Sequence, residues 1–340
     1  MSQSALAADA AIRASLNYIV DTGVKPVNET YGPNGLMRVQ SASFVRHVVP
    51  ITNGRPLRDS FSLDTSGFVL ADHPTKVKNF LDADELKSVY YAEMEKLIAL
   101  HSGACRVHVF DHTLRSGDKE TRDALKIREP VRVVHNDYTE WSGPQRVKDL
   151  LPDEAPDLLS RRFAIIQVWR AINAPIAKDP LAIAEAGSLA QRDFIAAERR
   201  FPDRVGEIYQ FAYNPAHRWV YFPRMRRDEA LVFKVYDSAK DGRARWGAHT
   251  SFDDPTTPPN TGPARKYRNP RLRVFLNLSR LRKRSTRREL RRVDSGAPTT
   301  SRGWTLDPDS PPNLGRRMAT LHGVFFRSVP WAARSNSISR

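Results

Sequence analysis

The chain has 340 residues, of which 40% are hydrophobic, so it can bury one substantial core and does not have the composition of a disordered protein. No apolar stretch reaches the length of a membrane span, and the single cysteine, Cys105, excludes an internal disulfide and any multi-cysteine metal site. We therefore expect a cytoplasmic protein in a reducing compartment that does not cross a membrane.

The net charge of +16 is concentrated at one end of the chain. Residues 266–340 hold eighteen Lys or Arg against four Asp or Glu, whereas residues 1–265 are almost balanced. A basic tail of this kind would bind nucleic acid or an acidic membrane surface. The near-neutral body and the lack of a nucleic-acid-binding motif argue against nucleic acid as a partner.

The first part of the chain mixes helical and strand-like segments. Residues 1–20 form an alanine-rich run of helical character, and 61–63 and 67–70 resemble strands. Apolar residues recur at helical spacing between 82 and 100, which predicts an amphipathic helix. Residues 105–110 alternate as a half-buried strand does, and 131–134 predict a second strand that ends at His135.

Strands dominate the second part. A helical stretch broken by prolines is expected at 144–159, a strand at 163–172 and a helix around 189–199. Strands rich in aromatic and β-branched residues follow at 208–213, 219–222, 230–236 and 243–252. The pattern predicts an α+β, mainly β fold in one domain over residues 1–265. Its core, about 105–255, would be a double-stranded β-helix, a cupin-like jelly roll with flanking helices.

His135-Asn136-Asp137 is a His-x-Asp pair at the end of a predicted strand. Residues two apart on an extended backbone face the same way, so the imidazole and the carboxylate can converge on one metal ion. His249, in the last predicted strand, would complete a two-His-one-carboxylate triad, which is the arrangement of non-haem Fe(II) oxygenases. In the structural alternative, His135 caps a strand end and Asp137 starts a turn.

Other side chains offer competing sites. His217, in a turn before the strand at 219–222, is an alternative third ligand to His249. His112 is expected on the inner face of its strand, near the site and beside Arg115. Cys105 has little support as a nucleophile, because buried strand cysteines are usually inert. No glycine-rich or Walker-type phosphate loop occurs, so nothing favours a nucleotide-binding fold.

Ordered blocks across roughly residues 15–265 resemble a family of oxidoreductases that includes the aspergillic-acid hydroxylase/desaturase and a subunit of cephamycin 7α-methoxylation. The blocks are FSLDTSGF (61–68), VFDHTLR (109–115), VHNDYT (134–139), VWRAIN (168–173), HRWVYFPRM (217–225), KVYDS (234–238) and HTSFDDP (249–255). The resemblance implies hydroxylation or desaturation of a small secondary-metabolite substrate, with Fe(II) and 2-oxoglutarate as cofactors. It also leaves open a non-catalytic partner subunit, or a component of S-adenosylmethionine-linked methoxylation, that works with another enzyme of a biosynthetic pathway.

The resemblance further implies which side chains serve the site. The expected iron ligands are His135, Asp137 and His249. A basic side chain would hold the distal carboxylate of 2-oxoglutarate, and the candidates within residues 1–265 are Arg245, Lys234 and Arg218. The expected substrate pocket is lined by His112, Tyr138, Trp169, Trp219 and Tyr221, with ordinary core packing as the alternative role for the aromatic residues among them.

The resemblance ends close to residue 266. The family continues with a strand of the form Glu-Ser-Ile-Glu-Ile-Arg, whereas this chain continues KYRNPRLRVF (266–275). One permitted back-translation of 266–274, taken one nucleotide later, gives Asn-Ile-Glu-Ile-Arg-Ala-Cys-Val. We hypothesise that residues 266–340 are translated out of frame, with a genuine, disordered basic tail as the alternative. The out-of-frame hypothesis predicts that a core strand with the candidate 2-oxoglutarate-binding Arg is missing, and an unbroken frame in the transcript across codons 260–275 would refute it.

Overall fold

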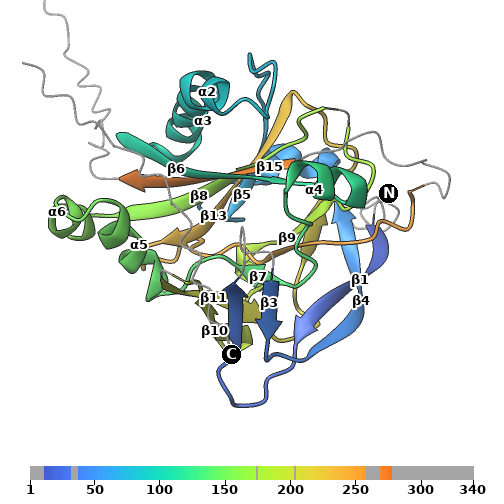
Figure 1. Cartoon of the computed structure of the whole chain (residues 1–340). Helices are drawn as coiled ribbons and strands as arrows, with labels where there is room; N and C mark the ends of the chain where they lie inside the picture. Colours follow the sequence, from blue (N-terminus) through green and yellow to red (C-terminus); the bar gives the residue numbers. More distant parts are fainter. Residues whose placement is uncertain (1–10, 32–36, 174, 203, 258–268, 278–340) are drawn as a thin grey trace, which may run out of the picture. The chain divides into compact units, whose positions relative to one another are not determined.

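The computed structural model describes residues 11–31, 37–173, 175–202, 204–257 and 269–277, all of which lie in one unit of the chain, Met1–Lys283. Within these residues the strands form two sheets (Figure 1). The ten-stranded sheet has the order β1 (Ala11–Ile19), β4 (Phe44–Asn53), β12 (Trp219–Tyr221), β9 (Leu181–Ala184), β14 (His249–Ser251), β7 (His135–Asn136), β11 (Val205–Phe211), β10 (Phe194–Arg200), β2 (Val27–Tyr31) and β3 (Met37–Gln40). The five-stranded sheet has the order β5 (Phe68–Asp72), β13 (Glu229–Asp237), β8 (Phe163–Trp169), β15 (Asn269–Asn277) and β6 (Arg106–Arg115).

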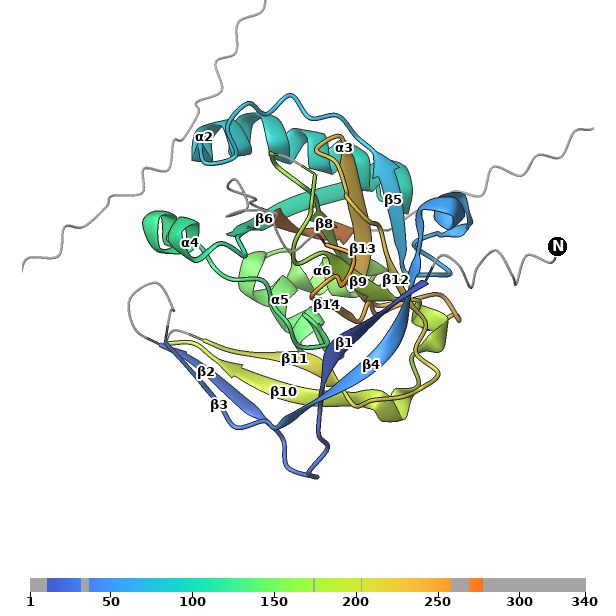
Figure 2. The same cartoon turned by 90° about the vertical axis from the view of Figure 1, so that its right-hand side faces the viewer.

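Helices cover the five-stranded sheet on its outer face (Figure 2). A continuous segment runs through α2 (Ala83–Glu85), a π-helical turn (Leu86–Tyr90) and α3 (Tyr91–Ser102). It begins where the Asp82 carboxylate accepts hydrogen bonds from the first backbone N–H groups, and it ends at Gly103 in the left-handed conformation. The other α-helices in the described part of the chain are α4 (Lys119–Leu125), α5 (Ser142–Leu150) and α6 (Ala155–Leu159). No helix described here is long and apolar enough to span a membrane.

The strands β8 and β13 are buried along their whole length because apolar residues pack on both of their faces. Alternate residues such as Val168 and Val232 face the helical layer, whereas Ile165 and Leu231 belong to the core between the two sheets. The inner core also contains residues of the ten-stranded sheet, such as Ile183. The expectation of an α+β, mainly β protein is confirmed.

Two helical predictions are wrong. The segment predicted as a helix around 189–199 contains β10, which pairs with β11 along its length and with β2 at its end. Part of the alanine-rich run at the N-terminus, Ala11–Ile19, is strand β1 and pairs with β4. Both segments are rich in Ala and Arg, which favour helices locally, but pairing with neighbouring strands decides their conformation.

Strand β15 lies between β8 and β6 and pairs with both. Residues 269–277 thus occupy a strand position in this sheet, and the predicted domain boundary at residue 265 stays a prediction. The alternation of Arg271, Leu272, Arg273 and Val274 suits a strand. The rest of the predicted basic tail, 278–340, lies outside the described residues, so its disorder and the out-of-frame hypothesis stay predictions.

Candidate active site

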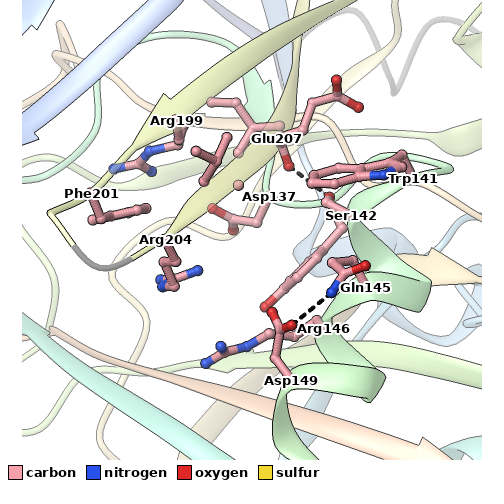
Figure 3. A pocket seen from close by; sticks show the side chains of 14 residues that line it. Asp137, Trp141, Ser142, Gln145, Arg146, Asp149, Arg199, Phe201, Arg204 and Glu207 are labelled. Atoms are coloured by element: carbon pink, nitrogen blue, oxygen red, sulfur yellow. Dashed lines mark hydrogen bonds between the residues drawn. The ribbon is translucent and has the colours of Figure 1, made fainter. Parts of the chain in front are cut away.

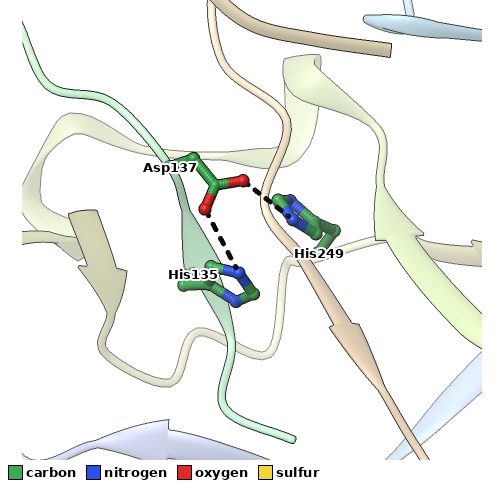
Figure 4. A group of neighbouring side chains, drawn as sticks. All are labelled: His135, Asp137 and His249. Atoms are coloured by element: carbon green, nitrogen blue, oxygen red, sulfur yellow. Dashed lines mark ion pairs between the residues drawn. The ribbon is translucent and has the colours of Figure 1, made fainter. Parts of the chain in front are cut away.

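The three predicted metal ligands, His135, Asp137 and His249, come together and are buried (Figure 4). Strands β7 and β14 pair so that His135 lies directly opposite His249. Nε2 of His135 lies 3.8 Å from Asp137 Oδ1, and Nε2 of His249 lies 3.6 Å from Asp137 Oδ2. One ligand atom from each residue lies within 4.8 Å of the others, so the three donors are gathered around one buried point.

Backbone carbonyls fix the orientation of both imidazole rings. His135 Nδ1 lies 2.7 Å from the carbonyl oxygen of Val133, and His249 Nδ1 lies 2.7 Å from that of Gly247. Because a carbonyl oxygen can only accept, Nδ1 carries a proton in each ring, and Nε2 of the neutral ring then keeps its lone pair. In the neutral rings, both Nε2 atoms can therefore serve as metal ligands.

Asn136, between the two ligands of the His-x-Asp pair, ties the ligand-bearing segments together. Its side-chain nitrogen donates to the carbonyl oxygens of Tyr138, at 2.7 Å, and Val235, at 2.8 Å. Its side-chain oxygen accepts a hydrogen bond from the backbone N–H of Gly247 at 3.1 Å. The fully buried amide thus connects the chain around Asp137 to β13 and to the residues leading into His249. Sequence analysis missed this role, although the position between His135 and Asp137 marks a side chain on the opposite face of the strand.

Two glutamines adjoin the triad from neighbouring strands. Gln167, on β8, donates from Nε2 to Asp137 Oδ2, and Gln210, on β11, pairs with His135 in the β-ladder. Among the described residues, the Oε1 atoms of both glutamines are buried without a hydrogen-bond partner. An unsatisfied buried acceptor costs about 1–3 kcal/mol, so a hydrogen-bond donor bound beside the triad would offset this cost.

The three basic residues predicted to bind 2-oxoglutarate have other partners. The Lys234 ammonium is buried and lies 2.7 Å from Asp64 Oδ1 and 2.8 Å from Asp237 Oδ2. Arg245 pairs with Glu140 at 2.7 Å and donates to the carbonyl oxygen of Asp237. Arg218 is largely exposed and lies 3.3 Å from Glu185. Each of the three cations is therefore engaged in an ion pair that could not be seen in the sequence.

The aromatic residues predicted to line the substrate pocket lie in two separate hydrophobic cores, one on each face of the ten-stranded sheet. Tyr138 and Trp169 belong to the core between the sheets, on the side of the triad. Trp219 and Tyr221 belong instead to the core on the other face, where Trp219 donates to the Tyr18 hydroxyl at 2.7 Å. Alternation along β12 explains the error, because Val220, between them, faces the triad side.

Two further histidines also lie away from the triad. His112 contacts the Tyr91 hydroxyl at 2.7 Å, on the side of β6 that faces α3. The ladder with β15 skips Phe110, and this β-bulge turns His112 away from the inner face where alternation predicts it. His217 is buried in a separate network, with Nε2 3.0 Å from Asp193 Oδ2 and Nδ1 3.3 Å from the Tyr18 hydroxyl. Burial lowers the pKa of His217, although Asp193 opposes this effect.

A pocket leads from Asp137 toward the surface, between α5 and the turn that joins β10 to β11 (Figure 3). Tyr138 and Ile208 line it where it is buried, whereas Trp141 and Arg204 are exposed at its mouth. The pocket holds a volume of about 50 Å³ and is open to solvent on one side.

Comparison with known proteins identifies relatives of this chain. The family model described as "Oxidoreductase/YMDC permease-like domain" matches residues 16–267. Hydroxylase/desaturase CTB9 of Cercospora beticola is 33% identical over 266 residues, which cover 72% of this chain and 80% of the relative. The Fe(II)/2-oxoglutarate-dependent dioxygenase nvfI of Aspergillus novofumigatus is 30% identical over 225 residues, covering 64% of this chain and 79% of the relative.

Solved structures share the fold. The iron and alpha-ketoglutarate-dependent endoperoxidase NvfI superposes with a TM-score of 0.71 at 22% identity, covering 80% of this chain and 100% of that structure. The family match includes all three residues of the triad. The chain therefore belongs to this oxidoreductase family, together with the hydroxylase/desaturases and Fe(II)/2-oxoglutarate-dependent dioxygenases that are similar to it.

Proposed function

We propose that the protein is an Fe(II)/2-oxoglutarate-dependent hydroxylase or desaturase of a small secondary metabolite, with His135, Asp137 and His249 as its iron ligands. One observation carries the proposal: two imidazole Nε2 atoms and one carboxylate converge at a buried point. We infer that the two sheets form a double-stranded β-helix of the jelly-roll type, an inference supported by the similarity to the endoperoxidase structure. A cytoplasmic location is part of the proposal.

The donor set suits the metal. Two neutral imidazoles and one carboxylate leave three coordination positions open, which is the ligand set of non-haem Fe(II) oxygenases. The unsatisfied Oε1 atoms of Gln167 and Gln210 mark where other polar groups would meet the protein. Gln167 also orients the Asp137 carboxylate by its hydrogen bond to Oδ2.

The bound iron, with 2-oxoglutarate and O2, would supply the oxidising chemistry that removes a substrate hydrogen. The protein's own residues bind and orient. The Val133 and Gly247 carbonyls hold the two rings, and Asn136 keeps their strands in register. The apolar core between the sheets, including Phe233 against the His249 ring, excludes water from the site.

We propose that the basic group for the distal carboxylate of 2-oxoglutarate comes from β15. Arg273 pairs with Gln167 and Arg271 pairs with Trp169 in the antiparallel ladder between β15 and β8. On β8, Gln167 and Trp169 face the triad side. We expect Arg271→Gln or Arg273→Gln to weaken 2-oxoglutarate binding about tenfold or more while Fe(II) binding is kept.

Anaerobic titration of the purified protein with Fe(II), with and without 2-oxoglutarate, tests the proposal. We expect a weak visible charge-transfer band that requires both components, that is lost in His135→Ala and His249→Ala, and that is kept in the matched control His112→Ala. Absence of iron binding in the folded wild-type protein would refute the assignment. A band without oxidation of any substrate would favour the alternative of a non-catalytic partner subunit.

A further inference from the structure

One amide side chain on the triad side of the ten-stranded sheet is buried although its acceptor is unused. Gln210, in β11, pairs with His135 in the β-ladder and is 3% exposed. Its neighbours Tyr209 and Phe211 pack in the core on the other face of the sheet, so alternation places the Gln210 side chain on the face of the triad. Ile208, two residues earlier on that face, lines the buried part of the pocket described above. Gln210 therefore lies next to the inner end of this pocket.

The neighbours of Gln210 on this face do not donate to its side-chain oxygen. On β10, the residue opposite Gln210 is the apolar Ile195. On β7, His135 Nδ1 is engaged with the carbonyl oxygen of Val133, and His135 Nε2 faces Asp137. In the part of the chain that the structure describes, Gln210 Oε1 has no hydrogen-bond partner. A buried amide oxygen without a partner is unfavourable, so this position suits a ligand that brings its own donor.

A second amide at the triad has the same unused acceptor. Gln167 Nε2 donates to a carboxylate oxygen of Asp137, which can only accept. The orientation of this amide is therefore fixed, and Oε1 is the atom left to accept from another group. It too is buried without a partner among the residues described. Two unused acceptors at one triad indicate that the space beside the metal ligands takes groups that donate hydrogen bonds.

The cofactors of the proposed reaction do not supply such a donor. 2-Oxoglutarate is a ketone with two ionised carboxylates and O2 has no hydrogen, so both can only accept hydrogen bonds. The donor therefore comes from water or from the substrate. A substrate that displaces ordered water loses affinity unless it reproduces the hydrogen bonds of that water. A hydroxyl group reproduces them, because it carries an O–H donor of the same kind.

We propose that the substrate carries a hydroxyl group close to the carbon that is oxidised, and that this hydroxyl donates a hydrogen bond to Gln210 Oε1. The inference rests on the proposed function, and it adds a class of substrate and a residue that selects it. A site built to pair with a hydroxyl rejects an analogue that lacks one, because its own buried polar group is then left unpaired. The same hydrogen bond would fix how the substrate is turned toward the triad.

An isomeric pair of probes, benzyl alcohol and anisole, tests the inference. Both consist of the same atoms and contain the same ring, but only the alcohol carries an O–H donor. The full chain is loaded anaerobically with Fe(II) and saturating 2-oxoglutarate, and the binding of each probe is measured by NMR from its proton signals. Additional broadening with Fe(II), relative to a sample loaded with Zn(II), shows that the probe lies close to the metal ion. We expect the wild-type protein to bind benzyl alcohol about tenfold more tightly than anisole.

Variants of Gln210 test which residue accepts the hydrogen bond. Gln210→Met replaces the amide by an apolar side chain of similar length, and Gln210→Leu by a shorter one. Each should lower the affinity for benzyl alcohol about tenfold and leave the affinity for anisole unchanged. Neither variant removes the hydrogen bond from Gln167 that orients Asp137. Gln191→Met, the same change at an exposed glutamine, is the matched control and should bind both probes as the wild type does.

Urea unfolding distinguishes a residue kept for a ligand from one that stabilises the protein. Replacing an unused buried acceptor by an apolar group of similar shape is close to neutral or stabilising. Gln210→Met should therefore unfold at a urea concentration no lower than that of the wild type. A clearly lower midpoint would show that the amide has a partner in the free protein, which contradicts the observation on which the inference rests.

Equal affinity for the two probes, or a preference for benzyl alcohol that survives both Gln210 variants, would overturn the inference. So would benzyl alcohol binding without additional broadening by Fe(II). The charge-transfer band, measured in the same samples, separates these results from failure of the proposed function. A normal band with no preference for benzyl alcohol refutes the hydroxyl site alone. A preference that depends on Gln210 in a protein without the band supports the role of Gln210 and refutes the oxygenase.

Discussion

Replacement of Gly247 by alanine should damage both the fold and the metal site. Gly247 lies where the chain leading into β14 crosses β13, and an ideal Cβ on it would lie 2.4 Å from the carbonyl oxygen of Lys234. Real Cβ atoms essentially never approach other atoms within 3.0 Å, so the backbone would have to retreat by roughly half an ångström or more. No flexible side-chain end can yield instead, because the opposing atom belongs to the backbone of a buried strand.

A shift of the Gly247 backbone would directly affect the groups that orient the triad. The Gly247 carbonyl oxygen holds His249 Nδ1 at 2.7 Å, and its N–H donates to Asn136 at 3.1 Å. Overpacking of this kind costs about 1–3 kcal/mol of unfolding free energy. Loss of a group that orients a metal ligand lowers metal affinity about 10- to 100-fold. We therefore expect Gly247→Ala to show both effects together.

Urea unfolding and competition with a chromogenic Fe(II) chelator measure the two quantities. Gly206→Ala is the matched control, because it makes the same substitution in a strand where the nearest atoms lie 3.8 Å from the new Cβ. It should change neither quantity appreciably. Wild-type stability and iron affinity in Gly247→Ala would show that the close approach to Lys234 does not constrain His249, and would refute the reasoning.

Three other predictions concern the surroundings of the triad. Gln167→Leu removes the donor to Asp137 and should lower Fe(II) affinity about tenfold in the chelator assay; unchanged affinity would contradict the orienting role. Lys234→Met should reduce the unfolding free energy by about 3 kcal/mol, because it leaves the buried Asp237 carboxylate with one fewer cation. The variant should keep the charge-transfer band that depends on 2-oxoglutarate. Loss of this band would indicate that Lys234 binds 2-oxoglutarate after all. Burial raises the pKa of Asp237, but Arg162 and Lys234 outweigh burial and hold that pKa below its usual value. The Asp237 carboxylate therefore stabilises the folded protein above the unfolded-state pKa of about 3.9, and this stabilisation is lost as the pH falls below that value. The unfolding free energy should decline more steeply between about pH 4 and pH 2 in the wild type than in Asp237→Asn.

The sequence predicts the part of the site that depends on the spacing of residues within one strand. The His-x-Asp pair faces one way because a strand alternates, and the strand order then brings His249 opposite His135. The supporting residues could not be predicted in the same way. Gln167 and Gln210 reach the triad from two other strands, and only the register of those strands shows that they do.

Errors arose where a tertiary feature changed the face of a residue or the state of a segment. A single bulge at Phe110 moved His112 to the helical side of its strand, and no residue pattern announces such a bulge. The segment 194–200 has residues that favour a helix, but it is a strand because β11 and β2 lie beside it. Lys234, whose charge in the sequence suggested a ligand-binding role, instead forms an ion pair with Asp237.

The position of β15 has a consequence for how the protein is made. This strand joins β6 to β8 in the middle of its sheet, yet it is the last described strand to leave the ribosome. Until then, the backbone groups of β6 and β8 that pair with it have no partner, and those edges are open to other chains. Folding of this sheet can finish only after synthesis has passed Asn277, so a nascent chain stalled before that point would depend on chaperones to stay unaggregated.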